Sequence, residues 1–517
     1  MCPASELGAS PRTNGAGAHG PGEETPGPAE VPGPAAPGPA GPNRAGALRT
    51  IGHGRSKAPH TPGNNRSWVG DAAVQDPASG LLAFNDAGLP GPAFEALTGT
   101  FRTHLQRARG GMAFTVYRAG APVARFYGGS RTERPSPDDP VRDPWTPDTM
   151  TVLFSGTKGL VATLAAVLAG RGELDVRVPV ARYWPEFAAN GKEDVRVWHL
   201  LSHTVGLPYV DPEPAGEWAV LDNAANARAL AAQRPLWEPG TRVAYHAITY
   251  GYLMTELLRR ITGKDVGALL AEELAQPLGL DVHLGLPESL DSRVAPVFRG
   301  PDYAISTFLE DPERRRIVER MYRGTLLGGD LFNTPQLRRG QLAAGGAVGT
   351  ADAMARLYSR LAVAVSPVAR GRDRTGCADS VNSDAHATDT DSSGSSNASS
   401  AGSGDDAHAA RTPGNGPDGT GTLVHPDALA QATREWAEGV DAINDRPLRF
   451  GLGFELDDSI GTYGPVRPAF GHSGAGGGLH GAWPEHGIGF SFLSNEMLAE
   501  NKDSRAKDLL TALARVL

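Results

Sequence analysis

Residues 151–158 read TVLFSGTK: a short apolar run leads directly into a serine and, three residues later, a lysine. Regularly spaced leucines predict a helix from this point to about Gly170. Ser155 and Lys158 then share one face of its first turn, and the serine lies at the N-terminus, where free N–H groups favour developing negative charge. A lysine shielded from water has a lowered pKa and can act as a base.

The tetrapeptide SGTK also has a simpler interpretation. The pattern S-x-x-K is common by chance, and a serine that caps a helix, followed by a surface lysine, accounts for it. Other segments are therefore needed to choose between a nucleophile with its base and an ordinary helix start.

The elements on either side of this helix predict an α+β fold. Upstream, a helix is expected over residues 92–109, followed by a hairpin with strands at 113–118 and 123–127. The middle of the chain is mostly helical, and strands return before a last helix. This order predicts an antiparallel sheet built from both chain ends and flanked by helices, with a mainly helical lobe inserted. The other predicted helices span 195–202, 250–262, 266–276, 312–323, 350–364 and 502–516, and the other strands 449–456, 479–484 and 488–495.

Two segments differ in composition from the rest of the 517 residues. The excess of Gly (66) and Pro (42) is concentrated in them, and the second is rich in Ser, Asp and Thr. Neither offers enough apolar surface to offset the conformational entropy lost on folding. We expect a disordered Pro/Gly/Ala-rich tail over 1–75 and one domain over 76–517, interrupted by a disordered insert at about 366–421.

Charge and cysteine content exclude several classes of protein. A formal net charge of −9 without a basic patch argues against nucleic-acid binding. The longest uncharged apolar run, 159–170, is too short to span a bilayer, and no secretory signal is visible, so a cytoplasmic protein without a membrane partner is expected. Both cysteines, Cys2 and Cys377, lie in the low-complexity segments. The folded part therefore has no structural disulfide, cysteine zinc site or cysteine nucleophile.

Three further segments accompany the S-x-x-K motif, in a fixed order along the chain. Residues 200–208 read LLSHTVGLP, residues 237–245 read WEPGTRVAY, and residues 471–478 read GHSGAGGG beside a predicted strand. With Ser155 and Lys158, these segments resemble the serine β-lactamase and penicillin-binding-protein superfamily, in the class C-like branch that includes the family VIII carboxylesterases. The resemblance implies a β-lactamase/transpeptidase-like fold.

The resemblance covers about residues 80–365 and 422–517, and it implies roles for individual side chains. Ser155 matches the nucleophile that becomes acylated, and Lys158 matches the lysine that shares its proton. Tyr245 matches the tyrosine that relays a proton between the nucleophile and the leaving group. A neutral lysine or a phenolate could each take the serine proton, so the identity of the base stays open.

The third motif is formed by His472, Ser473 and Gly474. The resemblance places it on an edge strand beside the cleft, with His472 among the catalytic groups and Ser473 and Gly474 contacting substrate. The backbone N–H groups of Ser155 and Ala475 would form the oxyanion hole. The resemblance implies neither a cofactor nor a metal ion.

Two positions depart from the lactamase pattern. The second motif has Ala247 where an asparagine usually holds the amide of the substrate, and the third has His472 where a lysine usually attracts a carboxylate. A histidine is mostly neutral near pH 7. Both changes remove contacts to a β-lactam or a peptide carboxylate, and they favour a small-molecule ester of small to medium acyl chain length as substrate.

Several alternatives remain for the function. A β-lactamase or D-Ala-D-Ala carboxypeptidase is the first, and a catalytically inactive binding or scaffold protein is the second. In a third, GHSGA would be an α/β-hydrolase elbow with Ser473 as nucleophile, but that motif requires a following helix, and glycines and a strand follow instead.

Three lesser candidates have mainly structural interpretations. His203 is expected to fix a turn, Asn333 to cap a helix, and His480 to lie on the strand after the glycines. The pair Gly345-Gly346 is expected to mark a close backbone approach.

Overall fold

The computed structural model describes residues 72–301, 303, 309–327, 330–366, 423–499 and 502–517. Nearly all of the predicted tail and insert therefore lie outside the described residues. Strand β1 (Val74–Asp76) pairs with β2 (Leu81–Phe84), so the folded domain begins before residue 76, the predicted start.

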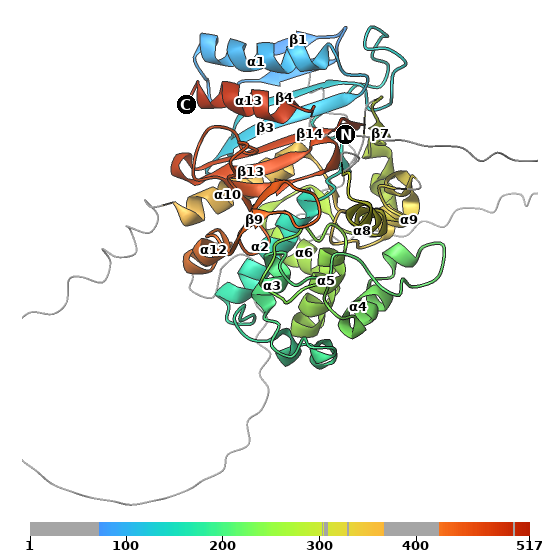
Figure 1. The fold of residues 1–517 in the computed structure, drawn as a ribbon. Coiled ribbons are helices and arrows are strands. Elements are labelled where there is room, and N and C mark those ends of the chain that lie inside the picture. Colours follow the sequence, from blue (N-terminus) through green and yellow to red (C-terminus); the bar gives the residue numbers. More distant parts are fainter. Residues whose placement is uncertain (1–71, 302, 304–308, 328–329, 367–422, 500–501) are drawn as a thin grey trace, which may run out of the picture. The chain divides into compact units, whose positions relative to one another are not determined.

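The central sheet combines strands from the two ends of the described chain, as predicted (Figure 1). Its order is β1-β2-β4-β3-β14-β13-β12-β11-β10-β9, and all neighbours are antiparallel. This confirms the α+β class and the hairpin near residue 120. The other strands are β3 (Gly111–Arg118), β4 (Ala121–Gly129), β9 (Ala437–Val440), β10 (Pro447–Phe450), β11 (Glu455–Leu456), β12 (Phe470–Ser473), β13 (Leu479–Trp483) and β14 (Ile488–Ser494).

The strand predicted over 449–456 is wrong in one respect, because the structure divides it into β10 and β11. The chain reverses between them, and Phe450 pairs with Glu455. Gly453 makes this reversal possible with a φ of +81°, a conformation that favours glycine. β11 then pairs with β12, which carries the third motif. The motif is therefore not on an edge strand, as the resemblance implied, and it has Glu455 as a neighbour.

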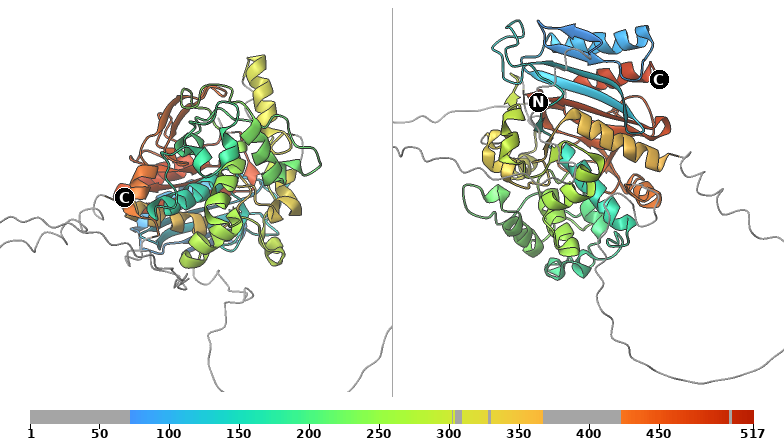
Figure 2. Two further views of the ribbon diagram at one scale, coloured as in Figure 1. Left: turned by 90° about the horizontal axis from the view of Figure 1, so that it is seen from below. Right: turned by 180° about the vertical axis from the view of Figure 1, so that it is seen from behind.

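Helices cover both faces of the sheet (Figures 1 and 2). α1 (Gly91–Leu105) and α13 (Arg505–Ala514) pack on one face, over inward-facing aromatic residues such as Phe126. α10 (Ala351–Val365) lies across the other face, and α2 (Gly156–Gly170) packs beside it against β12. α2 is apolar on every side and its residues 156–168 are all buried. It is thus a core helix, and its N-terminus lies next to the sheet.

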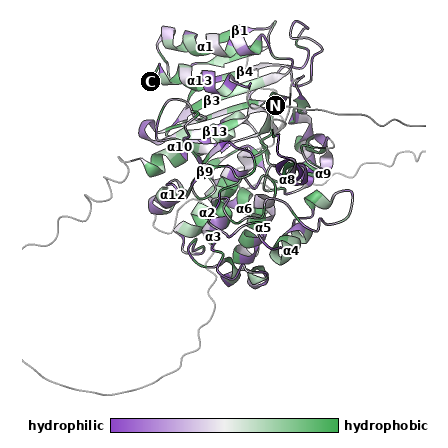
Figure 3. Ribbon diagram, in the orientation of Figure 1, coloured by the Kyte–Doolittle hydropathy of each residue, from purple (hydrophilic) through white to green (hydrophobic). Residues whose placement is uncertain are grey.

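The lobe between the two halves of the sheet is mainly helical, as predicted. α5 ends at Gly263, whose φ of +70° supplies the left-handed stop. α8 is strongly hydrophilic (Figure 3), and Arg315 and Arg316 on it are exposed. The helices are α3 (Val197–Leu201), α4 (Asn223–Ala232), α5 (Thr249–Thr262), α6 (Val266–Leu270), α7 (Gln276–Leu278), α8 (Pro312–Tyr322) and α9 (Pro335–Arg339), with α12 (Pro426–Ala432) following the undescribed segment.

The described residues also form two small sheets. β5 (Thr151–Val152), β8 (Val348–Gly349) and β6 (Val282–His283) form one, and β7 (Phe298–Arg299) pairs with β15 (Glu496–Met497) in the other. Among the helices that the structure describes, none has both the length and the apolar composition that crossing a bilayer requires.

Candidate active site

The backbone before α2 is held in a strained conformation. β5 ends at Val152, and Phe154 has a φ of +47°, which is rare for a residue with a side chain. The Phe154 ring is fixed against Phe332 at 4.7 Å between centroids. Residues in such conformations persist where surrounding packing imposes them, and they cluster at functional sites. The turn sets Ser155 at the N-cap position of α2, where sequence analysis predicted it.

Lys158 is fully buried beneath Ser155. Its Nζ lies 3.1 Å from Ser155 Oγ and donates to the carbonyl oxygens of Ala247 and Ala344, at 2.7 Å each. The two carbonyls come from distant segments, one after Tyr245 and one before the Gly345-Gly346 pair. The simple interpretation of SGTK, a surface lysine after a helix cap, is therefore wrong. Ser155 makes no side-chain cap hydrogen bond either.

The surroundings of Lys158 favour its neutral form. Burial lowers the pKa of the amine, the Glu455 carboxylate opposes part of this shift, and the positive charge of Arg446 adds to it, so that the pKa is lowered to about 7. An amine with this pKa is partly unprotonated at neutral pH. In the neutral form, the two hydrogens of the amine would be donated to the two carbonyls, which leaves the lone pair for the Ser155 hydroxyl at 3.1 Å.

The segment that carries Tyr245 is fixed on both sides by His203. The N–H of Ala244 donates to the carbonyl oxygen of His203 at 3.1 Å, and the N–H of His246 donates to its Nδ1, also at 3.1 Å. The N–H of Tyr245 itself donates to the buried carboxylate of Asp441 at 3.3 Å. His203 therefore has the turn-fixing role that was expected, and the turn that it fixes presents the tyrosine.

Tyr245 lies beside the serine–lysine pair. The Lys158 amine is 4.9 Å from the centre of its ring, and the Arg446 guanidinium is 5.3 Å away. Its hydroxyl makes no full hydrogen bond within the described residues, and the Ser155 hydroxyl is a polar neighbour. Burial raises the pKa of Tyr245 well above its usual value, with a further rise from Glu455. The phenol is therefore protonated at neutral pH.

His472 is buried and uncharged. Burial lowers its pKa to about 4, and its Nδ1 donates to the Ser473 carbonyl at 2.8 Å. Its Nε2 is thus left as an acceptor and has no partner within the described part of the chain. The ring lies 6.1 Å from that of Tyr245, between centroids. The third motif therefore reaches the site without supplying a positive charge near pH 7.

Glu455 contributes a negative charge directly behind the third motif. Its carboxylate accepts hydrogen bonds from the N–H of Ser473 at 2.9 Å, from the Ser473 hydroxyl at 3.0 Å and from the Tyr463 hydroxyl at 2.7 Å. Burial alone raises the pKa of Glu455, but neighbouring charges, including Arg446, and the hydrogen bonds it accepts lower it overall. The Ser473 hydroxyl thus donates its hydrogen to the Glu455 carboxylate.

Two backbone N–H groups are left free beside the serine. Within the described residues, neither Ser155 nor Ala475 donates a backbone hydrogen bond. Gly474 approaches the start of α2 so closely that a Cβ there would lie 2.7 Å from the Leu153 carbonyl and 3.7 Å from the N of Gly156. The turn after β12 and the N-terminus of α2 are therefore adjacent, as an oxyanion hole made from both requires.

The lesser candidates are placed as follows. His480 is buried under the first turn of α2, and a Cβ on Gly156 would lie 2.7 Å from its Nε2, so this histidine packs against the helix start. A Cβ on Gly345 would make only ordinary contacts with the Phe154 backbone, whereas one on Gly346 would lie 3.1 Å from the Leu342 carbonyl oxygen, so the expected close approach is found at the second glycine of the pair. Asn333 ends a short 3₁₀ turn and Thr334 caps α9, so its predicted capping role is wrong. Asn333 instead bridges to both backbone groups of Val297.

Comparisons with known proteins indicate the family of the chain. The family model described as Beta-lactamase matches residues 94–514. The chain belongs to the beta-lactamase family. It is 30% identical over 426 residues to the esterase/beta-lactamase LipL of Mycobacterium tuberculosis (strain ATCC 25618 / H37Rv), covering 80% of this chain and 83% of that protein.

Two solved structures of this family resemble the chain closely. A penicillin-binding protein homologue from Caulobacter crescentus has 29% identity and a TM-score of 0.65, and covers 83% of this chain and 99% of its own. A family VIII carboxylesterase has 28% identity and a TM-score of 0.64, with the same two coverages. The chain is thus a serine hydrolase of the β-lactamase-like family with esterase relatives.

Sequence reasoning missed three residues that the structure places at the candidate site. Asp441, Arg446 and Glu455 reach it from the β9–β10 hairpin and from β11, which lie nearly 200 residues or more beyond Tyr245. No local motif marks these three residues. The one signal in the sequence was Glu455, an acidic residue near the end of the strand predicted over 449–456. Its position did not show which way its side chain points.

Proposed function

We propose that the protein is a carboxylesterase that hydrolyses small to medium acyl esters without a carboxylate near the scissile bond, through an acyl-enzyme on Ser155. The observation that carries this proposal is the charge of the third motif. His472 is neutral there, and the Ser473 hydroxyl donates to the Glu455 carboxylate. The names of the relatives, an esterase/beta-lactamase and a family VIII carboxylesterase, support ester chemistry.

A β-lactam or a D-Ala-D-Ala peptide carries a carboxylate that must be bound. At this site the substrate carboxylate would approach the Ser473 hydroxyl, which already donates its hydrogen to Glu455. The negatively charged Glu455 carboxylate lies directly behind that hydroxyl. Two like charges in a partly buried site repel each other by more than they would in water. A neutral ester makes no such contact, so the same electrostatics leave its binding unaffected.

Acylation begins with proton transfer from Ser155 to Lys158. As Oγ attacks the ester carbonyl carbon, the lone pair of the neutral amine takes the hydroxyl proton. The carbonyl oxygen becomes negative, and the N–H groups of Ser155 and Ala475 stabilise it. One such donor is typically worth about 2.7–4 kcal/mol in the transition state.

The leaving alcohol receives its proton from Tyr245. The bond between the carbonyl carbon and the ester oxygen breaks, the alkoxide takes the phenol proton, and the Lys158 ammonium restores the phenol. The high pKa of Tyr245 and the pKa of Lys158 near 7 favour the lysine as the base and the tyrosine as the proton donor. Water then attacks the acyl-enzyme with these transfers reversed, which regenerates the Ser155 hydroxyl.

A substrate panel on the full chain tests the proposal. We expect p-nitrophenyl butyrate to be hydrolysed with a higher kcat/KM than nitrocefin or a D-Ala-D-Ala peptide. A fluorophosphonate probe should label wild-type protein and should not label Ser155→Ala. Faster hydrolysis of nitrocefin would identify a β-lactamase, and the absence of labelling together with the absence of turnover would identify a binding protein.

A further inference from the structure

The glycine-rich turn after the third motif has few internal contacts to fix its shape. Gly474 and Gly478 are joined by a hydrogen bond of 2.7 Å, and Gly476 and Gly477 have φ values of +77° and +93°. Glycine adopts many backbone conformations at little cost, so such a turn needs support from outside. Ala475, whose N–H is the second proposed oxyanion donor, lies within it.

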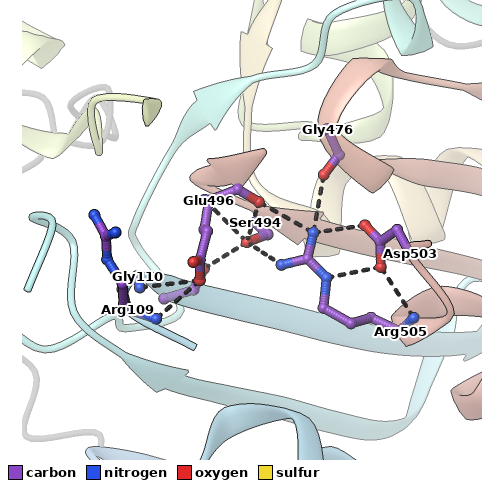
Figure 4. A network of polar contacts seen from close by, with 8 residues as sticks. Arg109, Gly110, Gly476, Ser494, Glu496, Asp503 and Arg505 are labelled. Carbon is purple, nitrogen blue, oxygen red and sulfur yellow. Dashed lines mark hydrogen bonds and ion pairs between the residues drawn. The ribbon is translucent and has the colours of Figure 1, made fainter. Parts of the chain in front are cut away.

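That support comes from Arg505, the first residue of α13. Its guanidinium is buried under the turn, and Nη2 donates to the carbonyl oxygens of Gly476 and Glu496, at 3.0 Å each (Figure 4). Nη1 donates to the Ser494 hydroxyl at 3.0 Å. One planar group thus ties the turn to the end of β14 and to β15.

Asp503 fixes the guanidinium in turn. Its carboxylate accepts from Arg505 Nε at 2.9 Å, from Nη2 at 2.6 Å and from the backbone N–H at 3.1 Å (Figure 4). Each side chain is only 5% exposed, so the pair is shielded from solvent. The same carboxylate lies against Gly477, where any Cβ would collide with it. The ion pair therefore contacts the turn at two successive residues.

We propose that Arg505, oriented by Asp503, is a positioning residue for the oxyanion hole. Its bond to the Gly476 carbonyl holds the 474–478 turn in the conformation that aims the Ala475 N–H at the acyl oxygen. Arg505 contacts no reacting atom. The inference rests on the proposed function, because the direction of that N–H matters only if it stabilises an oxyanion.

The contact network also explains why the last helix belongs to the catalytic domain. Glu496 accepts from the backbone N–H of Arg109 at 2.8 Å and from that of Gly110 at 3.4 Å, which links the loop before β3 to β15 (Figure 4). Arg505 then connects β15 to the turn. Segments from both chain ends thus converge on one backbone turn, and its position depends on the folding of both.

The test compares Arg505→Gln with Lys192→Gln as a control. Lys192 is another buried cation that donates to backbone carbonyls, those of Ala189 and Gln233, and it lies in the helical lobe, where none of its hydrogen bonds reaches the turn or the loop before β3. Both variants are expected to lose thermal stability. Arg505→Gln alone should lower kcat for p-nitrophenyl butyrate by about 100-fold, with KM changed less than about threefold, because small misplacements of catalytic groups have effects of this size.

A second readout isolates the oxyanion hole. A trifluoromethyl ketone forms a tetrahedral adduct on the serine, and Arg505→Gln should weaken its inhibition by a factor similar to the loss in kcat/KM, whereas the control should not. Asp503→Asn should show a smaller loss of the same kind, and it decides the matter if Arg505→Gln does not fold. Wild-type kcat and inhibition in the folded variants, or equal losses in the control, overturn the inference. Absence of ester hydrolysis in the wild type overturns the proposed function itself.

Discussion

At the scale of the residue, the proposed chemistry depends on one amine being kept from water. Lys158 has two carbonyl acceptors and a serine hydroxyl as its hydrogen-bonding partners, and its amine also lies near the rings of Tyr245 and Tyr250. A lysine in solution has a pKa of about 10.4 and could not act as a base at pH 7. Burial in a core helix lowers the pKa of Lys158, so the proposed mechanism requires the apolar composition of α2.

The pH dependence of esterase activity should therefore show the titration of Lys158. Its pKa is lowered to about 7, and the protonated amine cannot accept the serine proton. We expect kcat/KM for p-nitrophenyl butyrate to be level above about pH 8 and to fall about tenfold per pH unit well below pH 7. His472 and His480 have pKa values lowered by burial to about 4 and about 3, so they remain neutral throughout this range.

Two variants separate Lys158 from its neighbours in this experiment. Lys158→Arg keeps a positive charge that does not titrate, and it should lose at least 100-fold in kcat/KM at every pH. Tyr245→Phe should also reduce the rate, but its remaining activity should fall below pH 7 in the same way as that of the wild type; we call this fall the acid limb of the pH profile. A limb near pH 7 that survives in Lys158→Arg would show that another group is the base.

Sequence alone identified the residues that act through local patterns. Ser155 and Lys158 are three apart on one helix, so their proximity follows from helix geometry, and Tyr245 follows a recognisable segment. Asp441, Glu455 and Arg505 could not be identified in this way. Each reaches the site from a distant segment, through a strand register or a turn that forms only when the sheet is assembled.

At the scale of the element, the pairing of β11 with β12 places the negative charge of Glu455 behind the third motif. Glu455 is opposite Gly471 in this register, and its carboxylate reaches the next but one residue, Ser473. Prediction from sequence merged β10 and β11 into one strand, because an apolar run with two glycines does not reveal a chain reversal. That error hid Glu455, the residue on which the proposed preference for neutral esters rests.

Replacing Glu455 by glutamine should therefore change substrate preference. The amide still accepts hydrogen bonds but carries no charge, and we expect kcat/KM for an anionic ester, the mono-4-nitrophenyl ester of glutaric acid, to rise about tenfold relative to p-nitrophenyl butyrate. Because the Glu455 carboxylate raises the pKa of Lys158, the acid limb should also move to lower pH in this variant.

The control is Glu256→Gln on α5, another buried glutamate, which pairs with Arg259 and Arg260 in the helical lobe. It should leave both the substrate ratio and the pH limb unchanged. If Glu455→Gln has the wild-type ratio and limb, the carboxylate does not act on the substrate, and the preference for neutral esters has another source.

At the scale of the whole molecule, the order of the strands separates the N-terminal edge of the sheet from the catalytic elements. β1 is at one end of the sheet, with β2, β4, β3, β14 and β13 between it and β12. β1 is held by its pairing with β2 and by a hydrogen bond of 2.6 Å from the Ser79 hydroxyl to Asp76. Changes near residue 76 should therefore alter stability more than catalysis.

Two truncations test this separation. A chain that begins at residue 72 keeps β1, and its melting temperature and kcat/KM should match those of the full chain. A chain that begins at residue 77 loses an edge strand, and its melting temperature should fall by about 1–2 °C, as expected for about 1 kcal/mol in a domain of this size, with kcat/KM unchanged at 25 °C. A clear loss of stability in the first truncation would show that residues 1–71 contribute to the fold, and a loss of activity in the second at 25 °C would show that the edge of the sheet and the catalytic serine are coupled across its whole width.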